Sequence, residues 1–192
     1  MMDIMDLRDI HLGLSIWIVG KGPSLRYLTP DHFPRRGVVL CLNDSLRVIR
    51  RFNLTNPLYS MQKDGDPEYM VKPGADVTLL LQEPLSGSGY SSEWFPAHMK
   101  KVIISPVVEL GFQYEEATAT EMAISIAKLM GCIFIHMICC DILTTDDGRT
   151  INTWTGLSEM DDYKHSIYAH AKLRIMDDLK SIAHDFVVPE AL

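Results

Sequence analysis

The chain has 192 residues, which is the size of one domain and excludes a large multidomain assembly. Its 18 Lys and Arg against 25 Asp and Glu leave a net charge of −7, which argues against a protein that binds a nucleic acid backbone. With 47% hydrophobic and 22% charged residues, the chain can bury a core and does not have the composition of a disordered protein. We therefore expect one folded domain over residues 1–192 that does not bind nucleic acid.

The sequence shows neither a secretory signal nor a membrane span. A signal peptide needs a basic start followed by an unbroken apolar run, whereas the first residues here include Asp3, Asp6 and Asp9. The longest apolar stretch, residues 133–140, contains His136 and is far shorter than the roughly 20 residues that cross a bilayer. We expect a soluble, cytoplasmic protein.

The cysteines lie mostly in apolar runs and form no C-x-x-C pair. They are Cys41, Cys132, Cys139 and Cys140. A zinc ribbon or a disulfide framework is therefore poorly supported. Because free cysteine is commonly buried, we expect reduced thiols in the core.

Short runs of aliphatic and β-branched residues predict strands, and helix-compatible segments separate them. The predicted strands are Ser15–Val19, Val38–Leu42, Pro57–Met61, Asp76–Leu81, Lys101–Ser105 and Ile133–Cys139. Near-continuous apolar strands are typical of a parallel sheet that is covered on both faces. The order predicts a single Rossmann-like α/β domain, with a mostly parallel sheet of about six strands and helices on both faces.

Two segments have clear helical periodicity. The first is predicted over Thr120–Met130, with Gly131 as its stop signal. The second is predicted from Asp161 to His184, because it begins with acidic residues and carries an apolar stripe through Ala171 and Leu179. The last helix should close the domain.

Two polar segments are long for connections within a domain. They are Gln82–Glu93 and Asp141–Glu159, both rich in Gly, Ser and Thr. Each follows a predicted strand, and ligands of doubly wound sheets bind beyond the carboxyl ends of the strands. We expect these segments to be lid loops or loops that contact the substrate.

A glycine turn follows the first predicted strand. Gly20 and Gly22 permit a tight turn and close backbone approach, Pro23 suits a first helical turn, and Ser24 adds a hydroxyl. Such a turn can hold a phosphate. The order is not that of a Walker P-loop, and Leu25 stands where a dinucleotide fingerprint has its third glycine. The alternative is a turn between strand and helix that binds no ligand.

Three separated blocks share one resemblance. They are the G-x-G-P-S-L turn, the run Cys41–Asp44 at the end of the second strand, and the segment from Thr118 to Asp141. Together they resemble the superfamily of the bacterial CMP-sialic-acid-dependent sialyltransferases and the MptE-like 6-hydroxymethylpterin diphosphokinases. In those families the turn opens a Rossmann-like domain, Asn or Asp ends the second strand, and a small-residue helix precedes a strand that ends in Gly-x-Asp.

The resemblance implies a role for each matching position. It implies phosphate contact by Gly20, Gly22, Pro23 and Ser24, base, ribose or acceptor contact near Asn43, and ligand-facing positions for Thr118, Thr120 and Asp141. The last strand departs from the pattern, because it ends Cys139-Cys140-Asp141 without the usual glycine. The chain after Asp141 is also short for a sialyltransferase, which weakens the assignment to sialyl transfer.

A D-x-D pair follows the third predicted strand. Asp64 and Asp66 could hold Mg²⁺ or Mn²⁺ against nucleotide phosphates, because both ions prefer oxygen ligands. Asp-Gly dipeptides are also ordinary turn formers, so a polar turn is an equally good interpretation.

The candidate general base is His165. It lies four residues after Asp161, the spacing that places the two side chains on one helix face, where the carboxylate can orient the ring. An exposed histidine without a catalytic role is the alternative. We take His165 and Asp141 as the catalytic candidates.

The leading hypothesis is a nucleotide-dependent transferase. We favour glycosyl transfer from a nucleotide-sugar donor to an acceptor that the sequence does not identify, with Mg²⁺ or Mn²⁺ as the possible metal. One alternative is an MptE-like pyrophosphokinase that uses ATP. The other is a nucleotide-binding module without catalytic activity.

Overall fold

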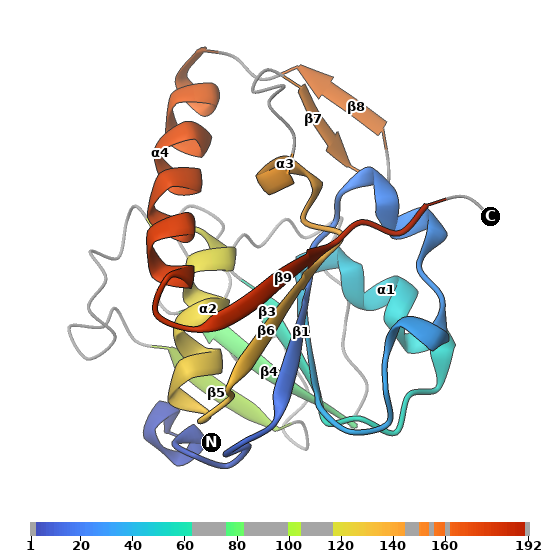
Figure 1. Ribbon diagram of the computed structural model, residues 1–192, viewed down its shortest axis with the longest axis vertical. Coiled ribbons are helices and arrows are strands. Elements are labelled where there is room, and N and C mark those ends of the chain that lie inside the picture. Colours follow the sequence, from blue (N-terminus) through green and yellow to red (C-terminus); the bar gives the residue numbers. More distant parts are fainter. Residues whose placement is uncertain are drawn as a thin grey trace.

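In the part of the chain that the structure describes, seven parallel strands form one sheet in the order β5-β4-β3-β2-β1-β6-β9 (Figure 1). The computed structural model describes residues 3–62, 76–82, 100–104, 117–144, 150–153, 156–159 and 162–190. The strands are β1 (Ser15–Val19), β2 (Val38–Leu42), β3 (Leu58–Gln62), β4 (Val77–Gln82), β5 (Lys101–Ile104), β6 (Phe134–Ile138) and β9 (Ala183–Val187). This architecture confirms the predicted single Rossmann-like α/β fold.

The strand order reverses at β1. From β1 the chain proceeds outward through β2, β3 and β4 to β5, and then returns to place β6 on the other side of β1. In doubly wound sheets such a reversal opens a crevice at the carboxyl ends of the two central strands. The carboxyl ends of β1 and β6 are therefore where this fold offers a binding site.

Helices cover both faces of the sheet, but not equally (Figure 1). One face carries α2 (Ala119–Leu129) and α4 (Asp162–Leu179), whose buried residues share a core cluster with η1 (Ile4–Leu7). The other face carries α1 (Leu46–Ile49) and short 3-10 turns. These turns are η2 (Pro23–Tyr27), η3 (Pro30–His32), η4 (Asn43–Ser45) and η5 (Arg50–Phe52). Short turns keep the connections between β1, β2 and β3 close to the strand ends.

The helix α2 begins with a capping box. The Thr118 hydroxyl accepts a hydrogen bond from the Glu121 amide, and the Glu121 carboxylate accepts one from the Thr118 amide (2.6 Å). The helix stops before Gly131, which has a φ of +77°, in the left-handed region that favours glycine. The predicted range Thr120–Met130 is thus confirmed to within one residue.

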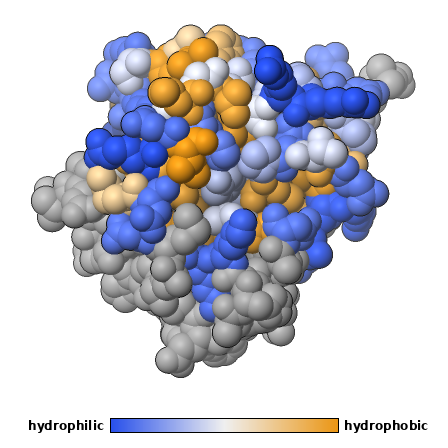
Figure 2. Space-filling model, turned by 90° about the horizontal axis from the view of Figure 1, so that it is seen from below, coloured by the Kyte–Doolittle hydropathy of each residue, from blue (hydrophilic) through white to orange (hydrophobic). Residues whose placement is uncertain are grey.

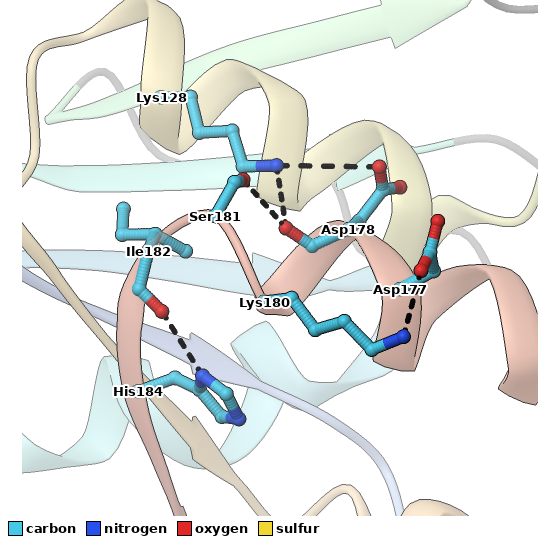
Figure 3. Close-up of polar contacts among 7 residues, drawn as sticks. All are labelled: Lys128, Asp177, Asp178, Lys180, Ser181, Ile182 and His184. Carbon is cyan, nitrogen blue, oxygen red and sulfur yellow. Dashed lines mark hydrogen bonds and ion pairs between the residues drawn. The ribbon is translucent and has the colours of Figure 1, made fainter.

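The helix α4 ends at Leu179, earlier than the predicted His184 (Figure 3). The Asp178 carbonyl accepts hydrogen bonds from Lys128 Nζ of α2 (2.7 Å) and from Ser181 Oγ (2.8 Å). The Ser181 amide also donates to this carbonyl (3.4 Å), so three donors meet it at the end of the helix. The predicted end was wrong because Ala183–Val187 forms the strand β9, so the chain leaves the helix before His184.

After this turn the chain forms β9, a strand that the sequence analysis missed. β9 pairs with β6 at the edge of the sheet, and His136 Nδ1 lies 2.8 Å from the Asp185 carboxylate across the pair. The His136 ring also stacks on Trp17, with ring centroids 4.5 Å apart. The polar side chains of His184 and Asp185 hide this strand from a search for apolar runs.

The segment Asp141–Glu159, predicted to be a lid loop or a loop that contacts the substrate, includes regular secondary structure. It contains α3 (Asp141–Thr144) and an antiparallel pair formed by β7 (Thr150–Thr153) and β8 (Gly156–Glu159). Of the other predicted loop, only Gln82 belongs to the described residues, as the last residue of β4.

At the amino ends of the strands, apolar residues gather on part of the surface, among hydrophilic ones (Figure 2). Leu12 and Ile133 are 71% and 61% exposed, and backbone hydrogen bonds join their segments, from Gly13 N–H to the Gly131 carbonyl and from Ile133 N–H to the Leu14 carbonyl. None of the helices in the described ranges has the length and apolar character needed to cross a membrane.

Packing of α4 on the sheet can be tested with two leucines of the same helix. Leu179 is fully buried, so Leu179→Ala should lower the free energy of unfolding by about 2–5 kcal/mol through lost burial and a residual cavity. Leu173 is 71% exposed, and Leu173→Ala should change the free energy of unfolding by less than about 0.5 kcal/mol. Urea denaturation of both variants measures the difference. Equal effects would contradict the placement of α4.

Candidate functional site

The candidate site lies where the strand order reverses, at the carboxyl ends of β1 and β6. The turn Gly20–Ser24 leaves β1, and residues 139–141 leave β6. The Gly20 amide donates to the Ile138 carbonyl (2.8 Å), and the Gly22 amide donates to the Cys139 carbonyl (2.9 Å). The turn thus continues the pairing of β1 with β6 beyond the strands.

Ser24 and Asp141, separated by 117 positions, are in direct contact. The Ser24 hydroxyl donates to Asp141 Oδ2 at 2.7 Å, and the Ser24 amide donates to Asp141 Oδ1 at 3.2 Å. Ser24 is 4% exposed, so this contact is mostly shielded from water. The structure therefore brings together a predicted phosphate-binding residue and a predicted catalytic residue.

The glycines of the turn are needed for packing within the chain. A side chain at Gly22 would overlap the Asp141 carboxylate, and one at Gly20 would overlap the Cys139 carbonyl. These contacts explain the glycines without a ligand, which was the alternative reading of the motif. They also place the Asp141 carboxylate where it accepts hydrogen bonds from the Ser24 amide and hydroxyl.

Cys139 occupies the place of the glycine in the Gly-x-Asp pattern. Its φ is +56°, a left-handed conformation that glycine adopts without strain and that other residues rarely adopt. Its thiol is fully buried; burial raises its pKa to about 12, and a hydrogen bond with Ser24 partly opposes the shift. Cys139 thus has a backbone conformation that favours glycine, although it carries a side chain.

All four cysteines are free and buried, as predicted. Burial raises the pKa of Cys132 to about 11 and raises those of Cys41 and Cys140 still further. Protonated thiols of this kind are poor nucleophiles and poor metal ligands. The cysteines therefore contribute to the core as protonated thiols.

Asn43 follows β2 at the same edge of the sheet. It has a φ of +49°, and its carbonyl accepts a hydrogen bond from Gln62 Nε2 at the end of β3 (3.3 Å). The nearby Ser45 hydroxyl donates to the Val19 carbonyl at the end of β1 (2.9 Å). These bonds connect the carboxyl ends of β1, β2 and β3.

The beginning of α2 lies at this edge as well, because α2 leads back to the start of β6. The Thr118 hydroxyl is occupied by the capping bond to Glu121, and Thr120 is half-buried in the first turn of the helix. Glu121 is 2% exposed and forms an ion pair with Arg174 of α4. The pair fixes α4 to the beginning of α2.

For three of the predicted site residues, the structure describes no side chain. Asp64 and Asp66 lie outside the described residues. His165 lies in the first turn of α4, but its side chain is not among those described, and Asp161 lies outside. Within the described part of the chain, no group of three His, Cys, Asp or Glu side chains could hold a metal ion.

Two features of the site were not predicted. Glu121 could have been found from the T-x-x-E capping pattern before an apolar helix. Gln62 is a single amide at a strand end, and nothing in its local sequence marks it. Its contact with Ser60 lies within β3, but its contact with the Asn43 carbonyl arises only because β2 and β3 are neighbours.

Comparison with known proteins supports the fold. No family model matches the sequence, and no curated protein matches it. The structure of the MAf glycosyltransferase from Magnetospirillum magneticum AMB-1 is similar to 97% of this chain, with a TM-score of 0.50 and 15% sequence identity. This chain spans 36% of the length of that protein. The likeness shows a shared fold and does not single out sialyltransferases or MptE-like proteins.

The contact between Gly22 and Asp141 predicts an energetic coupling. Gly22→Ala should displace the carboxylate and lower the free energy of unfolding by about 1–3 kcal/mol, the usual cost of overpacking. In an Asp141→Ala background the same change should cost at least about 1 kcal/mol less, because most of the overlapping atoms are gone. Urea unfolding of the four proteins measures the coupling. Additive effects would show that the two residues do not interact.

Proposed function

We propose that this protein is a nucleotide-dependent transferase that moves a glycosyl group from a nucleotide-sugar donor to an acceptor hydroxyl. One observation carries the proposal: the glycine turn, Asn43, Asp141 and the start of α2 all lie at the carboxyl edge where the strand order reverses. In this class of fold that edge is the place for a nucleotide. The structural likeness to a protein described as a glycosyltransferase favours the same reaction class.

The electrostatics of the turn suggest what the donor site needs. The Asp141 carboxylate lies beside the turn, so a phosphate bound there would meet a like charge. Lys21, half-exposed between the two glycines, supplies one positive charge. A divalent cation held by Asp64 and Asp66 would supply more and would neutralise the leaving phosphate.

In the proposed reaction, the acceptor hydroxyl loses its proton to a base as its oxygen bonds to the anomeric carbon. The bond between that carbon and the phosphate oxygen breaks, and the nucleotide leaves with the electron pair. We assign the base to His165. α4 runs back to β9 from its first turn, so its beginning lies at the carboxyl edge, on the same side as α3 (Figure 1). Asp141 is the second catalytic candidate, positioned by Ser24.

A thermal-shift screen tests donor binding. Nucleoside mono- and diphosphates, ATP and nucleotide sugars should be compared with and without Mg²⁺ or Mn²⁺, because a ligand that binds the native state stabilises it. At 100 times its dissociation constant, a ligand adds about 2.7 kcal/mol. Asp64→Asn with Asp66→Asn should remove the metal enhancement and leave metal-free binding in place.

The screen separates the hypotheses. Stabilisation by ATP but not by nucleotide sugars would favour a pyrophosphokinase. Binding without consumption of any donor would indicate a binding module. No stabilisation by any nucleotide would contradict the proposal, and equal metal enhancement in the wild type and the double variant would reassign the two aspartates to a turn.

His165→Ala tests the assignment of the base. It should lower kcat by roughly 10²–10⁴-fold while leaving donor affinity nearly unchanged, because a general base acts on the chemical step. His170→Ala is the matched control, because His170 is exposed on the same helix. Equal turnover in the two variants would exclude His165 as the base.

A further inference from the structure

Gln62 is a buried amide at the edge of the candidate site. It is the last residue of β3, and only 5% of its surface is exposed. Burying an amide is unfavourable unless its polar atoms find hydrogen-bond partners. Each of its polar atoms therefore needs a hydrogen-bond partner.

The orientation of the amide follows from its two contacts. Gln62 Nε2 donates to the Asn43 carbonyl at 3.3 Å and to Ser60 Oγ at 2.8 Å. A backbone carbonyl can only accept, so the nitrogen must face Asn43. Both N–H groups of the amide are thus used, and the side chain has only its oxygen left to offer.

That oxygen has no donor among the described residues. Neither the backbone nor any described side chain reaches Gln62 Oε1 with an N–H or O–H group. Buried side-chain acceptors are paired in the large majority of cases. An acceptor that is held rigidly, lies at a strand end and has no partner among the described residues points to a partner in a ligand.

The position fits the base of a nucleotide. β3 is two strands from β1, and neighbouring strands are about 4.8 Å apart, so their ends are about 10 Å apart. A mononucleotide has a similar length. A phosphate at the turn after β1 would place its base over the ends of β2 and β3, where Asn43 and Gln62 are in contact.

We propose that Gln62 selects the nucleobase of the donor, by accepting a hydrogen bond from an amino group on the base. This inference rests on the proposed nucleotide site. Cytosine carries an amino group at the ring position where uracil carries a keto group. Adenine and hypoxanthine differ in the same way. A keto oxygen facing Oε1 would set two acceptors against each other, so the site discriminates against the keto base.

Four mononucleotides test the proposal by calorimetric titration of the whole chain. CMP against UMP, and AMP against IMP, differ at this position. In one of the two pairs, wild-type protein should bind the amino base at least about tenfold more tightly, the size of effect that one discriminating hydrogen bond produces. Gln62→Met, similar in length but without an acceptor oxygen, should bind both members of that pair within about twofold.

Asn56→Leu is the matched control. Asn56 is also a buried amide, with Nδ2 donating to the carbonyls of Pro34 (3.0 Å) and Gly37 (3.1 Å), but it lies before the amino end of β3. This variant should keep the wild-type preference for the amino base. A preference lost equally in both variants would show that general destabilisation, and not Gln62, explains the change.

The outcomes separate this inference from the proposed function. If none of the four nucleotides binds the wild type, the nucleotide site itself fails, and the inference fails with it. Binding without an amino preference, or with a keto preference, overturns the inference alone, and this result needs no variant. A full preference retained by Gln62→Met would also overturn it.

Discussion

The packing of the turn after β1 against the end of β6 is the contact on which the site depends. β1 begins the outward half of the sheet and β6 begins the other half, so the turn joins the two halves where they meet. Because Gly22 has no side chain, the Asp141 carboxylate can reach both the amide and the hydroxyl of Ser24. A sharp turn, a serine and an acidic group are thereby held together at one end of the crevice.

The central strands could be predicted from sequence because both of their faces are buried. Val38–Leu42 is buried at every position, so its residues form an unbroken apolar run whose ends coincide with those of the strand. β9 could not be found in this way, because an edge strand exposes part of its surface and carries His184 and Asp185. In the turn before β9, Lys128 donates to the Asp178 carbonyl, a contact across 50 positions that the local sequence does not reveal.

Part of the candidate site could be predicted from the sequence, through the glycine motif and the family resemblance. The motif singled out Gly20, Gly22 and Ser24, and the resemblance added Asp141; the structure places these residues together. The glycines, however, are accounted for by contacts within the chain, which a motif alone cannot distinguish from contacts with a ligand. The left-handed conformation of Cys139 was hidden because a cysteine stands where the pattern has a glycine. Gln62 could not be singled out from the sequence, because its contact with the Asn43 carbonyl depends on the folded structure.

The edge strand β9 has a consequence for association between chains. An edge strand presents backbone groups that can pair with a strand from another molecule, and natural sheets discourage such pairing with charged side chains. On β9 the Asp185 carboxylate lies on the sheet surface beside His136, and its side chain is 47% exposed. A further strand laid against β9 would have to desolvate this carboxylate, at a cost in free energy. The polar character that hid β9 from sequence analysis therefore also protects the sheet from growing by aggregation.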